Sequence, residues 1–460
     1  MIKIENVSFG YQEKKRTLHK IEINVRQGEC ILLCGESGCG KTTITKLVNG
    51  LIPHFIQNDS LTGEVYVDDM NVGQTELYEL SKRIGSIFQN PKSQFFNLDV
   101  ESELAFGMEN EGKTAEFINE RVSRVAEELE MKDTLENSIF ALSGGQKQVL
   151  AVASVYAMNP DVYVFDEPTA NLDYEAVLRL KKLIVKLKRE RKTILIAEHR
   201  LWFLTDMIDR AIFIQNGEIR KNYTKDQFKK IGEDKRKMMG LRSLQYQQVT
   251  LPIAKLDVNQ DGLIVKNISF SYRDEKVFHN VSFSMNPGEI TAITGRNGAG
   301  KTTLIRCICG LLKEEQGEVL FNGKKLTKRQ RRKECYMVMQ DVNHQLFYES
   351  VWNECMQCVS RCGNEAEISE ILDEFDLKQL KEHHPMALSG GQKQRLAIAI
   401  AILCGKKILI FDEPTSGLDY KHMKQVAEVL KKLAQKGKII ILVTHDEELV
   451  RLTADKVYPL

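Results

Sequence analysis

The chain contains one set of motifs twice. GESGCGKTT at 35–43 returns as GRNGAGKTT at 295–303, and LSGGQKQ at 142–148 returns unchanged at 388–394. VFDEPTANLD at 164–173 likewise returns as IFDEPTSGLD at 410–419. Glu167 and Glu413 lie 246 positions apart, whereas Lys41 and Lys301 lie 260 apart, so the first half carries extra residues between its early and late motifs. Self-similarity of this kind indicates two copies of one domain.

The boundary between the copies falls in a polar run between positions 221 and 263. With 460 residues, the chain is too long for one ordinary domain and long enough for two full cores. We predict a first domain at 1–230, a linker at 231–261 and a second domain at 262–460. The start of this run, YTKDQFKKIGEDKRKM, has helical character, and its many charges favour a solvated linker.

Each half alternates short β-rich runs with helical stretches. The runs ECILLCG, VYVFDEP and KTILIAEH are typical of buried strands, and Tyr174–Arg189 has the pattern of a helix. This alternation predicts an α/β fold with a mostly parallel sheet flanked by helices. The closely spaced strands between Ile2 and Val25 predict an additional antiparallel layer. Asp455 aligns with Asp209, so we expect the second half to end before the counterpart of QNGEI.

The first repeated motif, G-x-x-x-x-G-K-[ST] between a strand and a helix, is a phosphate-binding loop. Its glycines let backbone N–H groups turn toward phosphates, and the following helix N-terminus adds positive potential. We expect Lys41 and Lys301 to contact the β- and γ-phosphates, and Thr42 and Thr302 to ligate Mg²⁺. The predicted nucleotide-binding residues of the two loops are Gly35, Glu36, Ser37, Gly38, Cys39, Gly40, Lys41, Thr42 and Thr43, and Gly295, Arg296, Asn297, Gly298, Ala299, Gly300, Lys301, Thr302 and Thr303.

Paired carboxylates follow two apolar strands. Asp166 and Asp412 end these strands, where an aspartate holds the metal or its water. The next residues, Glu167 and Glu413, can polarise an attacking water as general bases. They could instead cap helices before the prolines that follow them, but their recurrence beside a phosphate-binding loop favours catalysis.

His199 and His445 follow further apolar strands at the common 246-residue offset. A histidine at a strand end is usually structural, but at this place a ring N–H could reach the γ-phosphate. Gln89 and Gln340 are paired in the same way, and a glutamine side chain can ligate Mg²⁺ or hold a water. We therefore predict catalytic roles for both pairs and a metal-binding role for the glutamines.

Tyr11 and Tyr272 sit shortly after the first strand of each half. An aromatic ring there could stack on adenine, although aromatic residues near strand ends more often belong to the core. We include both tyrosines among the predicted nucleotide-binding residues.

Together, the phosphate-binding loop, LSGGQ, the Asp-Glu pair and the downstream histidine resemble the ATP-binding-cassette ATPases over nearly the whole chain. The resemblance implies two cassettes, each with a helical signature subdomain, that hydrolyse ATP with Mg²⁺. It also implies that each ATP lies between one cassette's phosphate-binding loop and the other's signature, most simply within one chain. The signature residues so implied are Ser143, Gly144, Gly145 and Gln146, and Ser389, Gly390, Gly391 and Gln392.

A finer resemblance concerns FQNPKSQFFNLDVESELAFGMEN at 88–110, which is similar to the ATPases of energy-coupling-factor importers with two fused cassettes. It implies ATP-driven uptake of a vitamin, a vitamin precursor or a metal ion. The implied partners are an integral membrane coupling subunit and a small membrane protein that captures the substrate. Gln94 would lie near a groove for a coupling helix, and the chain would lie on the cytoplasmic face of a prokaryotic membrane.

Charge and hydropathy agree with the interpretation as an ATPase that works with separate membrane subunits. Lys and Arg number 65 against 63 Asp and Glu, and this balance argues against a nucleic-acid partner. The longest apolar stretch, 396–404, is far short of the ~18 residues of a spanning helix, so other chains must supply the membrane part. MIKIENVSFG lacks the apolar core of a signal peptide, which predicts a cytoplasmic protein.

The ten cysteines are best interpreted as reduced thiols. Cys355, Cys358 and Cys362 share one helical face, but no fourth residue completes a familiar metal pattern. We therefore expect these three side chains to pack in a core.

Other functions remain as alternatives. A soluble twin-cassette protein acting on ribosomes would share the motifs, as would a sugar importer's ATPase, in which one site is usually degraded. A DNA-repair cassette would need long insertions for which this chain has no room. The two halves also differ, since Arg200 follows His199 whereas Asp446 follows His445. We accordingly leave open whether the two sites turn over equally.

Overall fold

The computed structural model describes residues 2–11, 17–56, 60–170, 172–257, 261–272, 275–359 and 365–460. The chain divides into two compact units, Met1–Tyr246 with Asp419–Lys421 and Gln247–Leu418 with His422–Leu460. Within the described ranges, no helix is long and apolar enough to cross a membrane.

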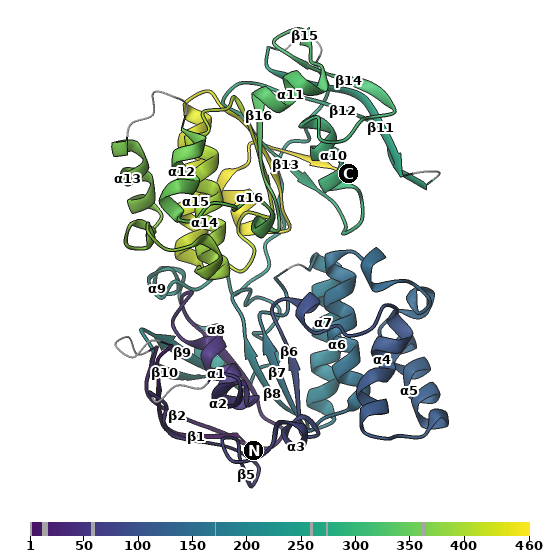
Figure 1. Cartoon of the computed structure of the whole chain (residues 1–460), viewed down its shortest axis with the longest axis vertical. Helices are drawn as coiled ribbons and strands as arrows, with labels where there is room; N and C mark the ends of the chain where they lie inside the picture. Colours follow the sequence, from purple (N-terminus) through teal and green to yellow (C-terminus); the bar gives the residue numbers. More distant parts are fainter. Residues whose placement is uncertain are drawn as a thin grey trace. The chain divides into compact units, whose positions relative to one another are not determined.

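The first unit contains two sheets (Figure 1). The larger has the order β10-β9-β3-β8-β7-β6, and all its neighbouring strands are parallel except β10, which is antiparallel to β9. Its strands are β3 (Cys30–Cys34), β6 (Ile84–Ile87), β7 (Val162–Asp166), β8 (Thr193–Ala197), β9 (Arg210–Gln215) and β10 (Glu218–Thr224). The antiparallel sheet has the order β2-β1-β4-β5, with β1 (Ile2–Phe9), β2 (Leu18–Val25), β4 (Thr62–Val67) and β5 (Met70–Asn71).

Helices cover both faces of the larger sheet because its central strands are apolar throughout. Along β7, Tyr163 and Phe165 enter the core shared with α4–α7, whereas Val162 and Val164 enter the core shared with α1 and the antiparallel sheet. The helices are α1 (Lys41–Val48), α2 (Leu51–His54), α3 (Leu77–Ser81), α4 (Val100–Asn110), α5 (Ala115–Glu128), α6 (Gly144–Met158), α7 (Tyr174–Arg189), α8 (Lys225–Lys229) and α9 (Glu233–Met238).

The second unit repeats this plan. Its parallel sheet has the order β16-β17-β18-β13-β19, with β13 (Ile290–Thr294), β16 (Cys335–Val338), β17 (Ile408–Asp412), β18 (Ile439–Val443) and β19 (Lys456–Pro459). Its antiparallel sheet has the order β12-β11-β14-β15, with β11 (Leu263–Tyr272), β12 (Glu275–Met285), β14 (Gln316–Phe321) and β15 (Lys324–Lys325). The helices are α10 (Lys301–Ile308), α11 (Lys328–Glu334), α12 (Val351–Cys358), α13 (Glu365–Glu374), α14 (Gly390–Leu403), α15 (Tyr420–Gln435) and α16 (Glu447–Thr453).

The predicted α/β architecture is therefore confirmed, including the antiparallel layer and the helix at Tyr174–Arg189. The expectation of a solvated run after Lys221 is wrong in part. Phe228 is fully buried, and Leu241 and Leu244 join the core of the first unit. A few apolar side chains in a highly charged segment are enough to hold it against the domain.

Candidate functional site: two phosphate-binding loops and their carboxylates

The phosphate-binding loop of the first unit joins β3 to α1. Gly40 has φ +108°, and a Cβ there would lie 2.4 Å from the Leu18 side chain, so only glycine fits. The Lys41 ammonium is buried and donates hydrogen bonds to the carbonyls of Gly35 at 3.0 Å and Glu36 at 2.9 Å. The loop thus holds a lysine charge at the start of a helix, where phosphates bind.

The second unit builds the same loop between β13 and α10. Lys301 Nζ donates to the carbonyls of Gly295 at 2.9 Å and Arg296 at 2.7 Å. The helix N-cap Gly300 has φ +91°, matching Gly40 in the first unit. Both predicted loops therefore have the same geometry.

At each site, two of the three predicted metal ligands, the threonine of the loop and the aspartate at the strand end, contact each other. Thr42 Oγ1 donates to Asp166 Oδ1 at 3.0 Å, and Thr302 Oγ1 donates to Asp412 Oδ2 at 2.8 Å. Burial, followed by the neighbouring Glu167, raises the pKa of Asp166 to about 7, and burial raises the pKa of Asp412 to about 6. A buried carboxylate beside a hydroxyl is a pair of hard oxygen ligands, and this donor set fits Mg²⁺.

The candidate bases share an unusual backbone conformation. Glu167 has φ +47° and Glu413 has φ +50°, in the left-handed region that non-glycine residues rarely adopt. Their N–H groups donate to the carbonyls of Ala197 and Val443, both at 2.8 Å. These bonds tie each glutamate to the strand that precedes the candidate histidine. Strained backbone of this kind clusters at active sites.

Around Glu167, two of the predicted site residues converge on the carboxylate. Gln89 Nε2 donates to Oε2 at 2.7 Å, and His199 Nε2 lies 3.4 Å from Oε1. Burial alone raises the pKa of Glu167, but the nearby His199 outweighs it and the net pKa lies below the usual value. The structure therefore brings Gln89, Glu167 and His199 into one cluster.

Around Glu413 the partners differ. Thr444 Oγ1 donates to Oε2 at 3.0 Å and the His445 backbone N–H donates to Oε1 at 3.1 Å. The His445 ring nitrogen Nε2 is 2.9 Å from Asn297 Oδ1 and 3.7 Å from Glu413 Oε1. Burial, followed by the charge of Asp412, raises the pKa of Glu413 to about 7. Gln340 follows β16 as Gln89 follows β6.

Two buried carboxylates beside the histidines, Glu198 and Asp446, were not among the site residues predicted from the sequence. Glu198 accepts hydrogen bonds from Thr169 and from the N–H groups of His199 and Arg200. In the second unit Asp446 accepts from Thr415 at 2.6 Å. The sequence does show an acidic residue next to each histidine. It precedes the histidine in the first half and follows it in the second, so it does not recur at the common offset.

The two signature serines begin long helices. Ser143 caps α6 in a reciprocal capping box with Gln146, and Ser389 caps α14 in the same way with Gln392. Gly144 and Gly390 are exposed, and a Cβ on either would meet nothing within 4 Å. Each signature therefore presents open backbone at a helix N-terminus, as an anion-binding site requires.

Tyr11 and Tyr272 are exposed by 43% and 48%, so the alternative that they are core aromatic residues is wrong. The Tyr11 hydroxyl lies 3.3 Å from Thr43 Oγ1, beside the phosphate-binding loop. The Tyr272 ring packs edge-on against Phe270 with centroids 4.8 Å apart. Both rings are therefore open to solvent over part of their surface, and the Lys46 ammonium lies over the Tyr11 ring, 5.7 Å from its centroid.

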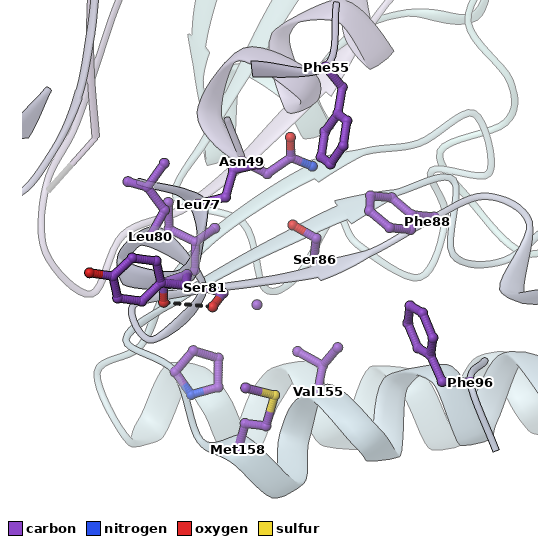
Figure 2. Close-up of a pocket in the computed structure, with 14 residues that line it drawn as sticks. Asn49, Phe55, Leu77, Leu80, Ser81, Ser86, Phe88, Phe96, Val155 and Met158 are labelled. Carbon is purple, nitrogen blue, oxygen red and sulfur yellow. Dashed lines mark hydrogen bonds between the residues drawn. The ribbon is translucent and has the colours of Figure 1, made fainter. Parts of the chain in front are cut away.

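A groove of about 520 Å³ opens in the first unit between α3, β6 and the C-terminal end of α6 (Figure 2). Its rim carries aromatic rings that are mostly exposed, namely Phe55 at 73%, Tyr78 at 64% and Phe96 at 74%. Gln94 shapes the nearby chain, because its amide donates to the Ser86 carbonyl and accepts from the Phe88 N–H, both at 2.9 Å.

The cysteine cluster matches its structural interpretation where it is described. Cys355 is buried on α12 and Cys358 is partly buried, both as free thiols. Cys362 lies outside the described residues. In the part of the chain that the structure describes, no group of three His, Cys, Asp or Glu side chains is arranged to hold a metal ion.

Two phosphate-binding loops, each beside an Asp-Glu pair and a histidine, together with two LSGGQ helices, define ATPases of the ATP-binding-cassette class. The comparisons agree, because residues 18–170 and 278–416 match the family model described as ABC transporter. The chain belongs to this family. It is an ABC transporter ATP-binding subunit with two cassettes, and an ATPase.

Relatives cover almost the full chain. An ABC transporter ATP-binding protein of Treponema denticola, so named provisionally, is 46% identical over 99% of this chain and 94% of its own length. A Bacillus subtilis protein with the provisional name HMP/thiamine import ATP-binding protein YkoD is 32% identical over 99% of this chain and 89% of its own length. A chain in the structure of ribosome-bound archaeal Pelota and ABCE1 covers 98% of this chain and 75% of its own, with TM-score 0.69 and 22% identity, which shows the fold alone.

Proposed function

We propose that this chain is the motor subunit of an energy-coupling-factor importer, working at the cytoplasmic face of a prokaryotic membrane. It would couple MgATP hydrolysis to uptake of a vitamin, a vitamin precursor or a metal ion through separate membrane subunits. The segment at 88–110 supports this proposal, as does the relative whose provisional name assigns it to HMP/thiamine import.

The observation that carries the proposal is the position of the groove. Its wall includes β6, and this strand leads directly to Gln89, whose amide donates to the candidate base Glu167 at 2.7 Å. Exposed aromatic rings around an apolar hollow fit an amphipathic helix laid into it. A membrane subunit docked in the groove would be linked to the Glu167 carboxylate through β6 and the Gln89 side chain.

At each site the chain's own residues would divide the work. Lys41 and Lys301 would bind the phosphates, while the strained backbone of Glu167 and Glu413 would hold a base toward the attacking water. His199 and His445 would contact the γ-phosphate, and Tyr11 and Tyr272 would stack on adenine.

The metal ligands are proposed from the same geometry. Thr42, Asp166 and Gln89 would hold Mg²⁺ in the first cassette, and Thr302, Asp412 and Gln340 would hold it in the second. When bound, Mg²⁺ neutralises phosphate charge.

The signature residues would complete the sites across the two cassettes of one chain. In this arrangement Lys41 works with Ser389, Gly390 and Gly391, and Lys301 works with Ser143, Gly144 and Gly145. The exposed helix N-termini at both serines support it, because each is preorganised by a capping box.

The partners follow from the same proposal. They are an integral membrane coupling subunit and a small membrane protein that captures the substrate, with no nucleic acid. The structural likeness to ABCE1 gives no support to a ribosomal role, because at 22% identity it reports only the shared two-cassette fold.

The test is affinity purification of the tagged full chain from mild-detergent extracts of its own cells. We expect one integral membrane scaffold and one small, very apolar membrane protein to copurify, and the ligand bound to the small protein would name the substrate. Copurification of ribosomal proteins without membrane proteins would overturn the proposal. Phe96→Glu alters the groove and leaves the catalytic cluster intact, so it should recover much less of the scaffold. The matched control is Phe140→Glu, at an equally exposed aromatic position, which should recover the scaffold normally.

A further inference from the structure

In the second cassette, several of the positions that correspond to the groove carry positive charges. Gln89 and Gln340 are 251 positions apart, and the same shift places the start of α3 on that of α11 and β6 on β16. Within this frame Tyr78 of the groove rim corresponds to Arg329, and Ser81 corresponds to Arg332.

The charge difference extends along the whole element. Residues 76–83 hold two acids and two bases, so their net charge is zero. The equivalent residues 327–334 hold five bases and one acid, so their net charge is +4. The 246-residue shift of the late motifs also replaces Pro160 of the groove by Lys406.

A buried arginine holds this charged element in place. Arg331 is only 2% exposed, and its guanidinium donates to the Cys307 carbonyl at 2.6 Å and to Glu314 at 2.6 Å. Lys406 Nζ donates to the Lys333 carbonyl at 2.9 Å, so it lies at the C-terminal end of the same helix. The packing thus fixes α11 through one residue and leaves its other basic side chains available.

Most of the other basic side chains here are exposed, whereas Lys406 is half-buried. We call Lys324, Lys325, Arg329, Arg332, Lys333 and Lys406 the α11 surface. Among the described residues, Arg329, Arg332 and Lys333 have no carboxylate within 4 Å, while Lys325 pairs with Glu318 at 3.1 Å. Phe347, the equivalent of Phe96, is 77% exposed, so the second cassette keeps the aromatic residue and exchanges apolar for basic residues elsewhere.

We propose that the α11 surface docks an acidic segment of the membrane-spanning subunit, whereas the groove of the first cassette docks an apolar segment. This inference rests on the proposed function. Complementary charge steers association and rejects the wrong partner, because an apolar segment would leave these cations unpaired and desolvated. The membrane subunit would therefore carry two different docking segments and would bind this chain in one orientation only.

The test uses the complex purified in detergent and a carbodiimide, which joins a lysine amine directly to a carboxylate without a spacer. We expect Lys324, Lys325, Lys333 or Lys406 to be linked to Asp or Glu of the integral membrane subunit, as identified by mass spectrometry. The variant Arg329→Glu/Arg332→Glu/Lys333→Glu should recover at least about tenfold less membrane subunit.

The matched control is Lys182→Glu/Arg189→Glu/Arg191→Glu, which makes the same charge change at exposed sites of the first cassette and should recover the subunit normally. ATP hydrolysis by the isolated α11 variant should equal that of the wild-type chain, which shows that it is folded.

Two results would overturn the proposal. One is a set of cross-links in which lysines of the α11 surface join no carboxylate of the membrane subunit. The other is full recovery of that subunit by the α11 variant, and if this variant also loses sedimentation with phosphatidylglycerol vesicles, the surface binds anionic lipid instead. If the wild-type chain itself recovers no integral membrane protein, the proposed function fails as well, and that result is separate from the other two.

Discussion

Glu198 Oε2 accepts a hydrogen bond from Thr169 Oγ1 at 2.7 Å, in a place where both residues are almost fully buried. In the second cassette Thr415 Oγ1 donates at 2.6 Å to Asp446 instead. Glu198 comes directly before His199 in the sequence, whereas Asp446 comes directly after His445. The equivalent threonines of the two cassettes therefore bind carboxylates from different sequence positions. The threonine follows the candidate base in each cassette, and this bond therefore ties the base's loop to the histidine's loop.

This difference between the cassettes predicts that one substitution can compensate for the loss of stability caused by another. Glu198→Thr should lower the free energy of unfolding by about 1–3 kcal/mol, because it leaves buried donors at Thr169 and His199 without an acceptor. Adding Arg200→Asp should recover much of that loss, since the sequence then matches Thr444-His445-Asp446. Urea unfolding of the wild type, both single variants and the double variant measures this. Strictly additive losses would show that the two arrangements are not equivalent.

The sequence predicted which residues form the candidate site more fully than it predicted which of their side chains contact one another. Both phosphate-binding loops, both Asp-Glu pairs and both histidines were visible, because each motif is local and recurs at a fixed offset. That His199 lies beside Glu167 while the His445 ring bonds Asn297 was not visible. Such pairings depend on how loops from three different strand ends meet, and the position of Asn297 is Ser37 in the first half.

The groove shows the same limit. Its residues come from segments as far apart in sequence as Phe55, Tyr78 and Met158, so no local pattern could assemble them. The segment after Gln89 could indicate a docking region only by resemblance. The fold was easier to predict than the groove, because apolar strands and amphipathic helices can be recognised from short-range periodicity in the sequence.

Removing a candidate base should trap nucleotide. Glu167→Gln or Glu413→Gln keeps the shape of the side chain but removes its ability to accept a proton, and general-base catalysis typically contributes about 10²–10⁴-fold. We expect the double variant to lose ATP turnover by at least about 10²-fold and to retain bound ATP. Phosphate release and filter-retained nucleotide measure the two effects. Full turnover in the double variant would rule out both glutamates as bases, and Glu175→Gln, an exposed site on α7, serves as the control.

The phosphate-binding lysines should behave differently from the bases. Lys41→Ala or Lys301→Ala removes the ammonium that lies against the loop carbonyls, so nucleotide binding itself should weaken. Loss of a charge-assisted hydrogen bond of about 1.5–3 kcal/mol corresponds to about a 10- to 150-fold weaker Kd. Titration with a fluorescent ATP analogue tests each site in turn. An unchanged Kd with reduced turnover would give the lysines a role in the chemical step alone.

The groove should be needed for the membrane partner and not for the isolated chain's hydrolysis. Phe96→Glu places a charge on an exposed aromatic position of the rim, where docking of an apolar segment would have to desolvate it. We expect loss of the copurifying membrane scaffold together with normal ATPase activity of the isolated chain. Phe140→Glu, at an equally exposed aromatic position of the same cassette, should retain the scaffold. Equal recovery by the two variants would argue against the groove as the docking site.

The residue that ends the first compact unit, Tyr246, packs against aromatic residues next to the candidate site. Tyr246 packs its ring 4.5 Å from that of Tyr174 and 5.1 Å from that of Trp202. Tyr174 begins α7 directly after Asp173, and Trp202 lies three residues beyond His199, so this aromatic cluster joins residue 246 to both loops.

Replacing Tyr246 by Ala should uncover Trp202 and move its fluorescence to longer wavelength. The chain has two tryptophans, so a Trp352→Phe background leaves Trp202 as the single reporter. Loss of two aromatic contacts should also cost about 1–3 kcal/mol of unfolding free energy, at roughly 0.5–1.5 kcal/mol for each pair. Phe140→Ala, at a 75% exposed aromatic position, should change neither quantity in the same background. If Tyr246→Ala leaves the emission and the unfolding midpoint unchanged, the three rings do not form a stable cluster in solution, and residue 246 is not held to the two loops.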